Sequence, residues 1–386
     1  MTATRTATEL RAWASIDLQA LQRNLAHARP PQSPASLIVV VKANAYGHGM
    51  LPVARALQSQ LRPRDCFGVA TLEEGLALRA AGLVQDIVLL EGVVTPAELD
   101  EALAANLQLV LHSDYQIEAL LQRLRRGSSV QPLVLWLKAD TGMHRLGFSQ
   151  DEFVRAWRAL HGHPAIAALR VMTHFACADD PASTMTDHQL QAFNAMLHAA
   201  DIVECERSVA ASAAIQQWPH AHFQWLRPGI MLYGGAAIVA ENGEDRGLRP
   251  VMTLHSRIMA VKQVKAGETL GYGASYRCER DMRIGIVSIG YGDGYPRRAP
   301  AGTPVLLRSR TQATQPTLRA PLCGRVSMDM LSIDLSDAPH IGIGDDVVLW
   351  GEGLPADEIA RLCGTIAYEL FCQVTPRVHH VYVGKE

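Results

Sequence analysis

A lysine at the end of an apolar run is the residue whose surroundings first suggest chemistry. Lys42 follows five apolar residues at 37–41 and precedes the segment ANAYGHG at 43–49. An ammonium group at the end of a buried strand is partly desolvated, so its pKa falls, and such an amine is suited to forming a Schiff base. A lysine that pairs with a carboxylate at the rim of a sheet fits the same pattern. Lys42 alone therefore leaves both interpretations open and identifies no cofactor.

Other polar residues also stand where apolar runs end. They are Lys138, His174, Ser212 and Arg227. Because the carboxyl ends of parallel strands meet at one edge, we expect these side chains to lie near Lys42. Each has an ordinary structural explanation as well: an ion pair for the lysine or the arginine, a core position for the histidine, and a helix N-cap for the serine.

Eight short apolar runs account for how these residues are positioned. The runs are apolar at nearly every position, which is typical of parallel strands buried on both faces. Segments with helical periodicity lie between them, and eight such units in about 220 residues indicate a (β/α)8 TIM-like barrel over residues 11–240. The runs are Leu37–Val41, Cys66–Ala70, Asp86–Leu90, Leu107–Leu111, Leu133–Leu137, Ala168–Thr173, Ser208–Ala211 and Trp225–Tyr233, and the helical segments are Leu51–Leu61, Leu72–Ala81, Pro96–Ala105, Tyr115–Arg126, Gln150–His161 and Asp187–Ala200.

The pattern changes after residue 240. A polar linker at 241–250 is followed by β-type runs that Gly, Pro and Asp turns separate, so we expect a mainly β C-terminal domain over 241–386. The N-terminal strand at 11–17 is a candidate to pack with this domain. The β-type runs are Val251–Val264, Arg283–Ile289, Pro304–Arg308, Val326–Leu335, Asp346–Trp350 and Arg377–Val383, with helices at Pro355–Cys363 and Ala367–Cys372.

One part of this second domain is rich in arginine. Between Asp293 and Asp329 the chain has no acid and six arginines, which are Arg297, Arg298, Arg308, Arg310, Arg319 and Arg325. We expect a solvated hairpin whose tip lies at 309–317, with an anion-binding surface as the alternative.

Composition excludes several classes of protein. The 386 residues include 36 Lys+Arg against 38 Asp+Glu, and 48% are hydrophobic, which argues against a disordered chain and against a nucleic-acid partner. The first 20 residues contain no apolar core of the kind found in signal peptides, and no long apolar stretch occurs, so we expect an unsecreted protein with no membrane segment and a cytoplasmic location. The seven cysteines form no CxxC or His/Cys ligand spacing, which predicts buried reduced thiols and no metal site.

Eight blocks, in order along the chain, resemble those of the alanine racemases, which use pyridoxal 5′-phosphate (PLP). The resemblance extends from about Trp13 to Val378. The blocks are VVKANAYGHG (40–49), KADTGMHRLGF (138–148), THFACAD (173–179), WLRPGIMLYG (225–234), GYGASY (271–276), IGYGDGYPRR (289–298), GRVSMDM (324–330) and YEL (368–370). Any single block is weak, but eight in one order are specific.

The resemblance implies two catalytic bases and one residue that sets how strongly PLP withdraws electrons. Lys42 would hold PLP through a Schiff base and remove the proton from the D-enantiomer, whereas Tyr272 would remove it from the L-enantiomer. Racemisation needs a proton donor on either face of the α-carbon, so two bases make mechanistic sense. Without the blocks, Tyr272 is more simply a packing residue. Arg227 would face the pyridine nitrogen, and because a guanidinium accepts no proton, PLP would be a weaker electron sink.

The resemblance also implies a set of binding residues. Arg145 would contact PLP and the substrate carboxylate, and Lys138 matches a lysine that many members carry carbamylated, although an ordinary ion-pairing lysine is as compatible with the sequence. His174 would link Arg227 to the catalytic tyrosine. The PLP phosphate would contact Tyr46, Ser212, Gly229, Ile230 and Tyr368. This chain has Ala-Ser-Ala at 211–213 where some members have Asn-Ser-Ala, so one polar phosphate contact is in question.

A substrate gate and a homodimer are implied as well. Met328 and Asp329 resemble the gate segment, and Tyr291 resembles the tyrosine that narrows the entrance. In the family the β domain of one subunit covers the barrel of the other, so Tyr272, Tyr291 and Met328 would act in trans. The expected reaction is interconversion of L- and D-alanine, with D-alanine supplied for peptidoglycan or, alternatively, alanine broken down.

Three alternatives remain open. A racemase of broader specificity would also accept serine or other amino acids. A PLP decarboxylase of the same architecture would be expected to show a triple-glycine loop and an acid facing the pyridine nitrogen, whereas this chain has only Gly234-Gly235 and the segment RPGI. A non-catalytic PLP-binding barrel would lack the β domain that carries Tyr272.

Overall fold

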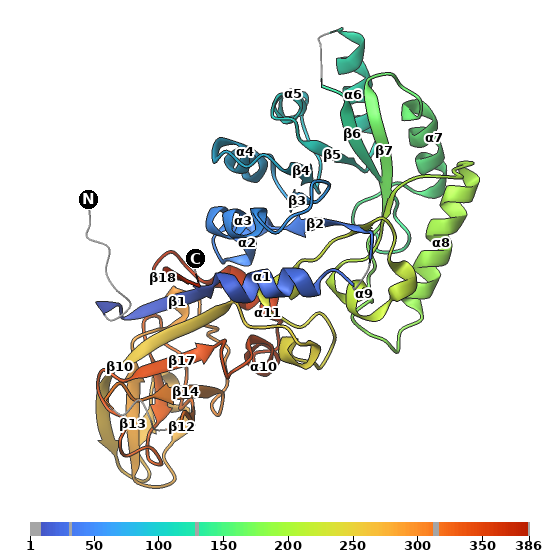
Figure 1. The fold of residues 1–386 in the computed structure, drawn as a ribbon. Coiled ribbons are helices and arrows are strands. Elements are labelled where there is room, and N and C mark those ends of the chain that lie inside the picture. Colours follow the sequence, from blue (N-terminus) through green and yellow to red (C-terminus); the bar gives the residue numbers. More distant parts are fainter. Residues whose placement is uncertain (1–8, 31–32, 128–130, 312–315, 385–386) are drawn as a thin grey trace.

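The first part of the chain forms an eight-stranded parallel barrel with helices around it (Figure 1). The computed structural model describes residues 9–30, 33–127, 131–311 and 316–384. The strand order is β8-β7-β6-β5-β4-β3-β2-β9, and one parallel bridge between Ala211 and Arg227 joins the two ends. The strands are β2 Ser36–Val40, β3 Cys66–Val69, β4 Asp86–Leu89, β5 Gln108–Leu111, β6 Leu133–Lys138, β7 Ile166–Met172, β8 Arg207–Ser208 and β9 Trp225–Leu226. The predicted barrel is confirmed.

Local sequence explains most barrel elements. Three helices begin with a capping box, in which a Thr or Ser side chain accepts from the third helical amide and a Glu returns the bond, as Thr71 and Glu74 do. The helices of this part are α1 Leu18–His27, α2 Lys42–Tyr46, α3 Met50–Gln58, α4 Leu72–Ala80, α5 Pro96–Ala104, α6 Asp114–Arg125, α7 Gln150–Leu160, α8 Met185–Ala199 and α9 Ser212–Gln217. The sequence prediction did not include α1, α2 or α9.

The predicted eighth strand at Trp225–Tyr233 was too long. The strand covers only Trp225–Leu226, and a short 3₁₀ helix at Ile230–Tyr233 follows. Pro228 has no amide hydrogen for a ladder, and Gly229 takes a non-strand conformation with φ −124° and ψ −99°. Arg227 is therefore the point where the chain leaves the barrel, and the apolar residues after it are buried in a helix rather than a strand.

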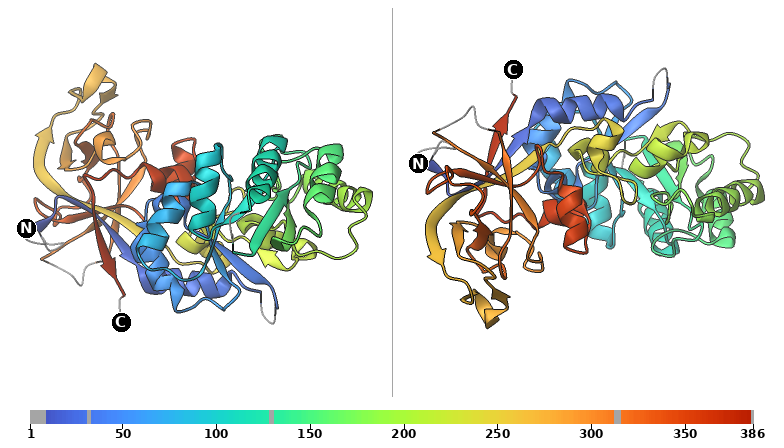
Figure 2. Two further views of the ribbon diagram at one scale, coloured as in Figure 1. Left: turned by 90° about the horizontal axis from the view of Figure 1, so that it is seen from above. Right: turned by 90° about the horizontal axis from the view of Figure 1, so that it is seen from below.

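The second part is built around one twisted, mainly antiparallel sheet that includes the N-terminal strand. Strand β1 pairs with β10 in antiparallel and with β18 in parallel fashion, so the first and last strands of the chain lie side by side in this sheet (Figure 2). The elements are β1 Ala12–Asp17, β10 Met252–Val264, β11 Thr269–Leu270, β12 Tyr276–Arg277, β13 Met282–Val287, β14 Pro304–Arg308, β15 Leu318–Pro321, β16 Leu331–Asp334, β17 Asp346–Trp350, β18 His379–Val383, α10 Ala356–Leu362 and α11 Ala367–Gln373. The mainly β character is confirmed, whereas the domain boundary at 240 stays a prediction.

Two expectations about the second part need comment. The run predicted at Val326–Leu335 is a strand only over Leu331–Asp334, and the preceding residues form a loop. The arginine-rich segment forms the hairpin β14–β15, and three of its arginines pair with acids from other segments, as Arg319 does with Glu358 at 2.7 Å. These pairs favour a solvated hairpin over an anion site. Residues 312–315 of its tip lie outside the described residues.

Three further features of the fold concern its cysteines, its helices and possible metal ligands. All seven cysteines are free, but only four are buried, and Cys372 is exposed, so the expectation of uniformly buried thiols was wrong. Among the helices that the structure describes, none is both long and apolar enough to cross a bilayer. Within the described ranges, no group of three or more His, Cys, Asp or Glu side chains could hold a metal ion.

Candidate active site

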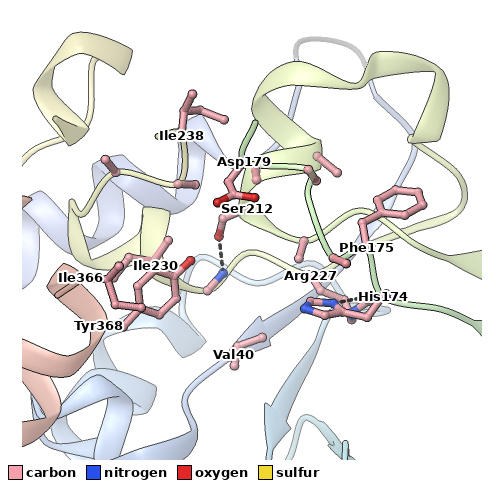
Figure 3. Close-up of a pocket in the computed structure, with 18 of the residues that line it drawn as sticks. Val40, His174, Phe175, Asp179, Ser212, Arg227, Ile230, Ile238, Ile366 and Tyr368 are labelled. Atoms are coloured by element: carbon pink, nitrogen blue, oxygen red, sulfur yellow. Dashed lines mark hydrogen bonds between the residues drawn. The ribbon is translucent and has the colours of Figure 1, made fainter. Parts of the chain in front are cut away.

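A cavity of about 1110 Å³ lies where the barrel strands end. Lys42, Lys138, His174 and Arg227 line it, each placed at or just after the carboxyl end of a different strand. Ser212 and the loop residue Arg145 complete the barrel side, and α11 of the second part closes another side with Tyr368. Figure 3 shows Arg227 and His174 together on one side of the cavity and Tyr368 with Ile230 on the other. The residues that follow the predicted strands therefore lie together, as expected from their positions at the carboxyl ends of parallel strands.

The segment that carries Lys42 is a left-handed turn. Residues 43–46 have φ between 51° and 55°, which is the left-handed region, and none of them is glycine. Such a conformation costs about 1–2 kcal/mol for a residue other than Gly or Asn, so Ala43, Ala45 and Tyr46 together contribute about 3–6 kcal/mol of backbone strain. Contacts from other elements hold it: the Ala43 amide donates to Glu74 at 2.6 Å, and the Met50 amide donates to Asn44 at 2.8 Å. Strain of this kind is typical of functional sites.

Two glycines allow α11 and β18 to approach this turn closely. A Cβ on Gly47 would lie 2.1 Å from the carbonyl oxygen of Phe371, and a Cβ on Gly49 would lie 2.0 Å from the hydroxyl of Tyr382. Both glycines also have positive φ. Gly47 and Gly49 therefore allow the C-terminal part of the chain to pack against the turn that follows Lys42.

Lys138 is a basic group of the cavity whose pKa is lowered by its surroundings. Burial, followed by the charges of Arg227, Arg145 and Lys42, lowers the pKa of Lys138 to about 8. About one tenth of the Lys138 amine is then neutral at pH 7, far more than for an ordinary lysine. The carboxylate of Glu91 lies 3.8 Å from the Nζ of Lys42 and partly offsets this positive field.

Arg227 is buried, and within the described residues its hydrogen bonds are to neutral groups. Its Nη1 donates to the carbonyl and hydroxyl oxygens of Ser208 at 2.6 and 2.8 Å, and its Nη2 donates to the carbonyl of Thr173 at 2.7 Å. Burial lowers the pKa of Arg227 to about 10, so it remains charged. Nη2 also donates to Nδ1 of His174 at 3.3 Å, which places the histidine proton on Nε2.

His174 is held neutral. Burial and the charges of Arg227, Lys138, Arg145 and Lys42 lower its pKa to about 3. The cavity therefore presents a fixed guanidinium and a neutral imidazole side by side. Neither group can accept a proton from a ring nitrogen near neutral pH, because the guanidinium has no acceptor and the Nδ1 of His174 already accepts from Arg227.

A small polar cradle lies beside these groups. The Ser212 hydroxyl accepts from the amides of Gly229 at 2.9 Å and Met231 at 3.4 Å. A Cβ on Gly229 would lie 2.8 Å from the hydroxyl oxygen of Tyr46, so only glycine leaves this space open. The ring of Tyr46 lies 5.8 Å from that of Tyr368. Hydroxyls and amides that converge on one space suit a phosphate group, so these residues fit the phosphate of PLP.

The structure does not bring the predicted second base or the gate into this cavity. Tyr272 is 69% exposed in the turn between β11 and β12, and Met328 is 52% exposed. The amide of Tyr291 donates to the carbonyl of Ser327, next to Met328, so these residues form one surface of the β part. Asp329 accepts from Arg377 at 2.6 Å on the same surface. Within one chain, Tyr272 and Lys42 do not line the same pocket.

Comparisons with known proteins match both parts of the chain. The alanine racemase N-terminal domain model matches residues 16–237, and the alanine racemase C-terminal domain model matches 251–382. The chain belongs to the alanine racemase family. An alanine racemase from Shewanella woodyi is 44% identical over 366 residues, which cover 95% of this chain and 97% of that protein. As a member of this family the chain is an isomerase of the alanine racemase class, which argues against the decarboxylase and non-catalytic alternatives.

Solved alanine racemase structures share the fold. The biosynthetic alanine racemase from Pseudomonas aeruginosa has a TM-score of 0.88 and 45% identity, with 97% of this chain and 99% of that chain covered. The alanine racemase from Bartonella henselae, whose structure contains covalently bound pyridoxal phosphate, has a TM-score of 0.85 and 27% identity, with 97% and 100% covered.

Sequence reasoning missed several residues of this alanine racemase site. Glu91, which lies near Lys42, directly follows the apolar run at 86–90, so the strand-end rule could have found it. Glu74 holds the left-handed turn through the Ala43 amide, and only its capping-box position was visible in the sequence. Cys372 lines the cavity from α11, and no local signal in the sequence indicated this.

Proposed function

We propose that the chain interconverts L- and D-alanine with PLP as cofactor, by a two-base mechanism that uses Lys42 and Tyr272. The observation that carries the proposal is that Lys42 and Arg227 line one cavity, with Arg227 bonded to neutral acceptors. The primary amine of Lys42, together with the guanidinium of Arg227, which only donates hydrogen bonds, would favour proton transfer at the substrate α-carbon. A carboxylate in place of Arg227 would favour other PLP reactions.

Residues of this chain would hold the cofactor at four points. Lys42 would supply the amine for a Schiff base, Arg227 would face the pyridine nitrogen, and Arg145 would face the phenolic oxygen. The phosphate would be held by Tyr46, Ser212, Gly229, Ile230 and Tyr368, which lie around the cradle. When bound, PLP supplies an electron-withdrawing ring that stabilises negative charge at the substrate α-carbon. Because Arg227 takes no proton, this withdrawal is kept moderate, which disfavours transamination.

The two bases would come from different subunits of a homodimer. Lys42 holds or delivers a proton on one face of the α-carbon, and Tyr272 of the partner chain does so on the other face. Tyr272 is exposed and outside its own chain's cavity, which supports its use in trans. The exposed residues Tyr291 and Met328 lie on the same β surface and would narrow the entrance, with Asp329 held by Arg377.

Arg145 would bind the substrate carboxylate, and a carbamylated Lys138 would hold Arg145 in place. A guanidinium binds a carboxylate through two parallel hydrogen bonds, so Arg145 orients alanine. A neutral amine is the form that reacts with carbon dioxide, and the pKa of Lys138 near 8 supports its carbamylation. The carbamate would give a negative partner to Arg145 amid the basic groups of the cavity. Isotopically labelled bicarbonate, followed by a carbamate signal that Lys138→Ala loses, tests this.

The biological use is proposed in two forms. The enzyme supplies D-alanine for peptidoglycan, or it takes part in alanine breakdown, since the same site chemistry performs both. A racemase of broader specificity that also accepts serine is the second candidate, and the bulky Tyr291 and Met328 at the proposed entrance favour the small side chain of alanine.

The test offers purified protein with and without PLP to L-alanine, D-alanine, L-serine and L-lysine. Chiral chromatography measures the products. We expect PLP-dependent racemisation of alanine, a visible absorbance band that borohydride abolishes, and loss of both in Lys42→Ala. Comparable turnover of serine or lysine would overturn the assignment to alanine, and full activity of Lys42→Ala would overturn the covalent role of Lys42.

A further inference from the structure

His48 is a fully buried histidine directly behind the left-handed turn. It has no exposed surface, and its ring packs 4.6 Å from the ring of Tyr233 and 5.1 Å from that of Phe371, measured between centroids. Tyr233 in turn stacks on Tyr46 at 4.9 Å and donates from its hydroxyl to the carbonyl of Val40, the last residue of β2. The ring of His48 thus packs with Tyr233 and Phe371 beside the turn, and it does not line the cavity.

One nitrogen of His48 makes all of its side-chain hydrogen bonds. Nδ1 lies 3.0 Å from the carbonyl oxygen of Ala45 and 2.8 Å from that of Tyr46. Carbonyl oxygens only accept, so Nδ1 carries the hydrogen and donates to both. Nε2 has no partner within the part of the chain that the structure describes. Burial lowers the pKa of His48 to about 3, which keeps the ring in this neutral form.

These two carbonyls belong to the strained part of the turn. Ala45 and Tyr46 both have left-handed backbone angles, and a buried carbonyl without a donor is costly. The carbonyl of Ala45 also accepts from the backbone amides of Gly47 and His48, the latter at 3.0 Å, whereas among the described residues the carbonyl of Tyr46 accepts from the imidazole alone. The donor on Nδ1 therefore favours the left-handed turn over a relaxed conformation.

We propose that His48 is a positioning residue for the cofactor site, which holds the left-handed turn so that the Lys42 amine and the Tyr46 hydroxyl meet the cofactor at fixed places. The inference rests on the proposed use of PLP by this site. It assigns no chemical step to His48, because the imidazole does not line the cavity. Its contribution is made before the cofactor binds, through the conformation of residues 43–46.

A matched set of substitutions separates the donor from the ring. His48→Asn places an amide N–H where Nδ1 lies, whereas His48→Gln carries the same group farther out, where Nε2 lies. His48→Phe keeps a ring against Tyr233 and Phe371 and removes the donor. Each protein is purified with PLP, and we measure the PLP dissociation constant by equilibrium dialysis, the visible band, kcat and KM for alanine, and amide hydrogen exchange of the peptide that covers 42–50.

We expect His48→Phe and His48→Gln to bind PLP at least about tenfold more weakly, which corresponds to about 1.4 kcal/mol. Their amides at 45–49 should exchange about tenfold faster, while peptides from β17 keep their rates. His48→Asn should stay within about threefold of the unaltered protein in PLP affinity, because it keeps the donor. If His48→Phe fails to fold, the Asn and Gln pair decides alone.

Two results would overturn the inference. One is a folded His48→Gln or His48→Phe protein whose PLP affinity and kcat are unchanged, because the histidine would then only stabilise the fold. The other is equal weakening by Asn and Gln, because the position of the donor would then not matter. An unaltered protein that binds PLP but racemises no alanine refutes the proposed function instead, and the PLP affinities still decide the role of His48.

Discussion

Two inactive variants of this chain should restore activity to each other when they share a dimer. Lys42→Ala removes the amine from the cavity, and Tyr272→Phe removes the hydroxyl from the exposed turn between β11 and β12. Loss of one proton-transfer group lowers the rate by about 10²–10⁴. In the proposed homodimer each site combines Lys42 of one chain with Tyr272 of the other, so one of the two sites in a mixed dimer would receive both intact residues.

The size of the recovery follows from this arrangement. Random reassociation of equal amounts makes about half of the dimers mixed, each with one intact site, so about one quarter of the unaltered activity should return. Dimers purified through a different tag on each chain should reach about one half per dimer by the same count. Both values lie far above the sum of the two parent variants.

The assay is racemisation of L-alanine and of D-alanine, followed by chiral chromatography, on co-expressed and separately expressed chains. Tyr276→Phe is the matched control, since this tyrosine belongs to the same ribbon and its hydroxyl contacts the sulfur atoms of Met282, at 3.9 Å, and of Cys323. The Tyr276→Phe protein should be active when it is expressed alone, without a second variant to complement it. Mixed dimers that are no more active than their parents would refute the shared site, and equal small losses in both directions for Tyr272→Phe would refute its role as a base.

Three further predictions follow from the buried groups. The free energy of unfolding should fall as pH drops below about 6.5, by about 1.4 kcal/mol per pH unit for each of His48 and His174. Their pKa near 3 in the fold lies below that of the unfolded chain, so the unfolded chain takes up protons that the folded chain does not. Denaturant titrations from pH 7.5 to 5 at fixed protein concentration measure this, and a flat profile contradicts it. Arg227→Glu should lower racemisation about 10²-fold or more and raise the yield of pyruvate relative to D-alanine, since it replaces a donor-only group with an acid; a coupled pyruvate assay tests this, and an unchanged ratio argues against the assigned role. Gly229→Ala should weaken PLP binding about tenfold while the secondary structure is retained, because its Cβ would lie 2.8 Å from the hydroxyl of Tyr46; equilibrium dialysis measures the affinity, and an unchanged value would place the phosphate elsewhere.

The sequence by itself determined the barrel and the order of its strands. Runs that are apolar at every position can only be buried on both faces, so their spacing predicted a parallel barrel, and the strand-end rule placed Lys42, Lys138, His174 and Arg227 in one cavity. This information is local, since it lies in residues adjacent along the chain. The same rule failed at 228–233, where the apolar residues were buried by a 3₁₀ helix, because burial alone does not distinguish a strand from a helix.

Only the tertiary structure decided the conformation of the turn at 43–46 and the surroundings of the lysine. In Ala-Asn-Ala-Tyr only the asparagine tolerates left-handed angles readily, and the turn is held by Glu74, α11 and β18, which reach it from other parts of the fold. The exposure of Tyr272 is likewise a result of how the β part folds. Strain of this size needs contacts between segments far apart in the chain, and a linear pattern of residue types carries no record of those contacts.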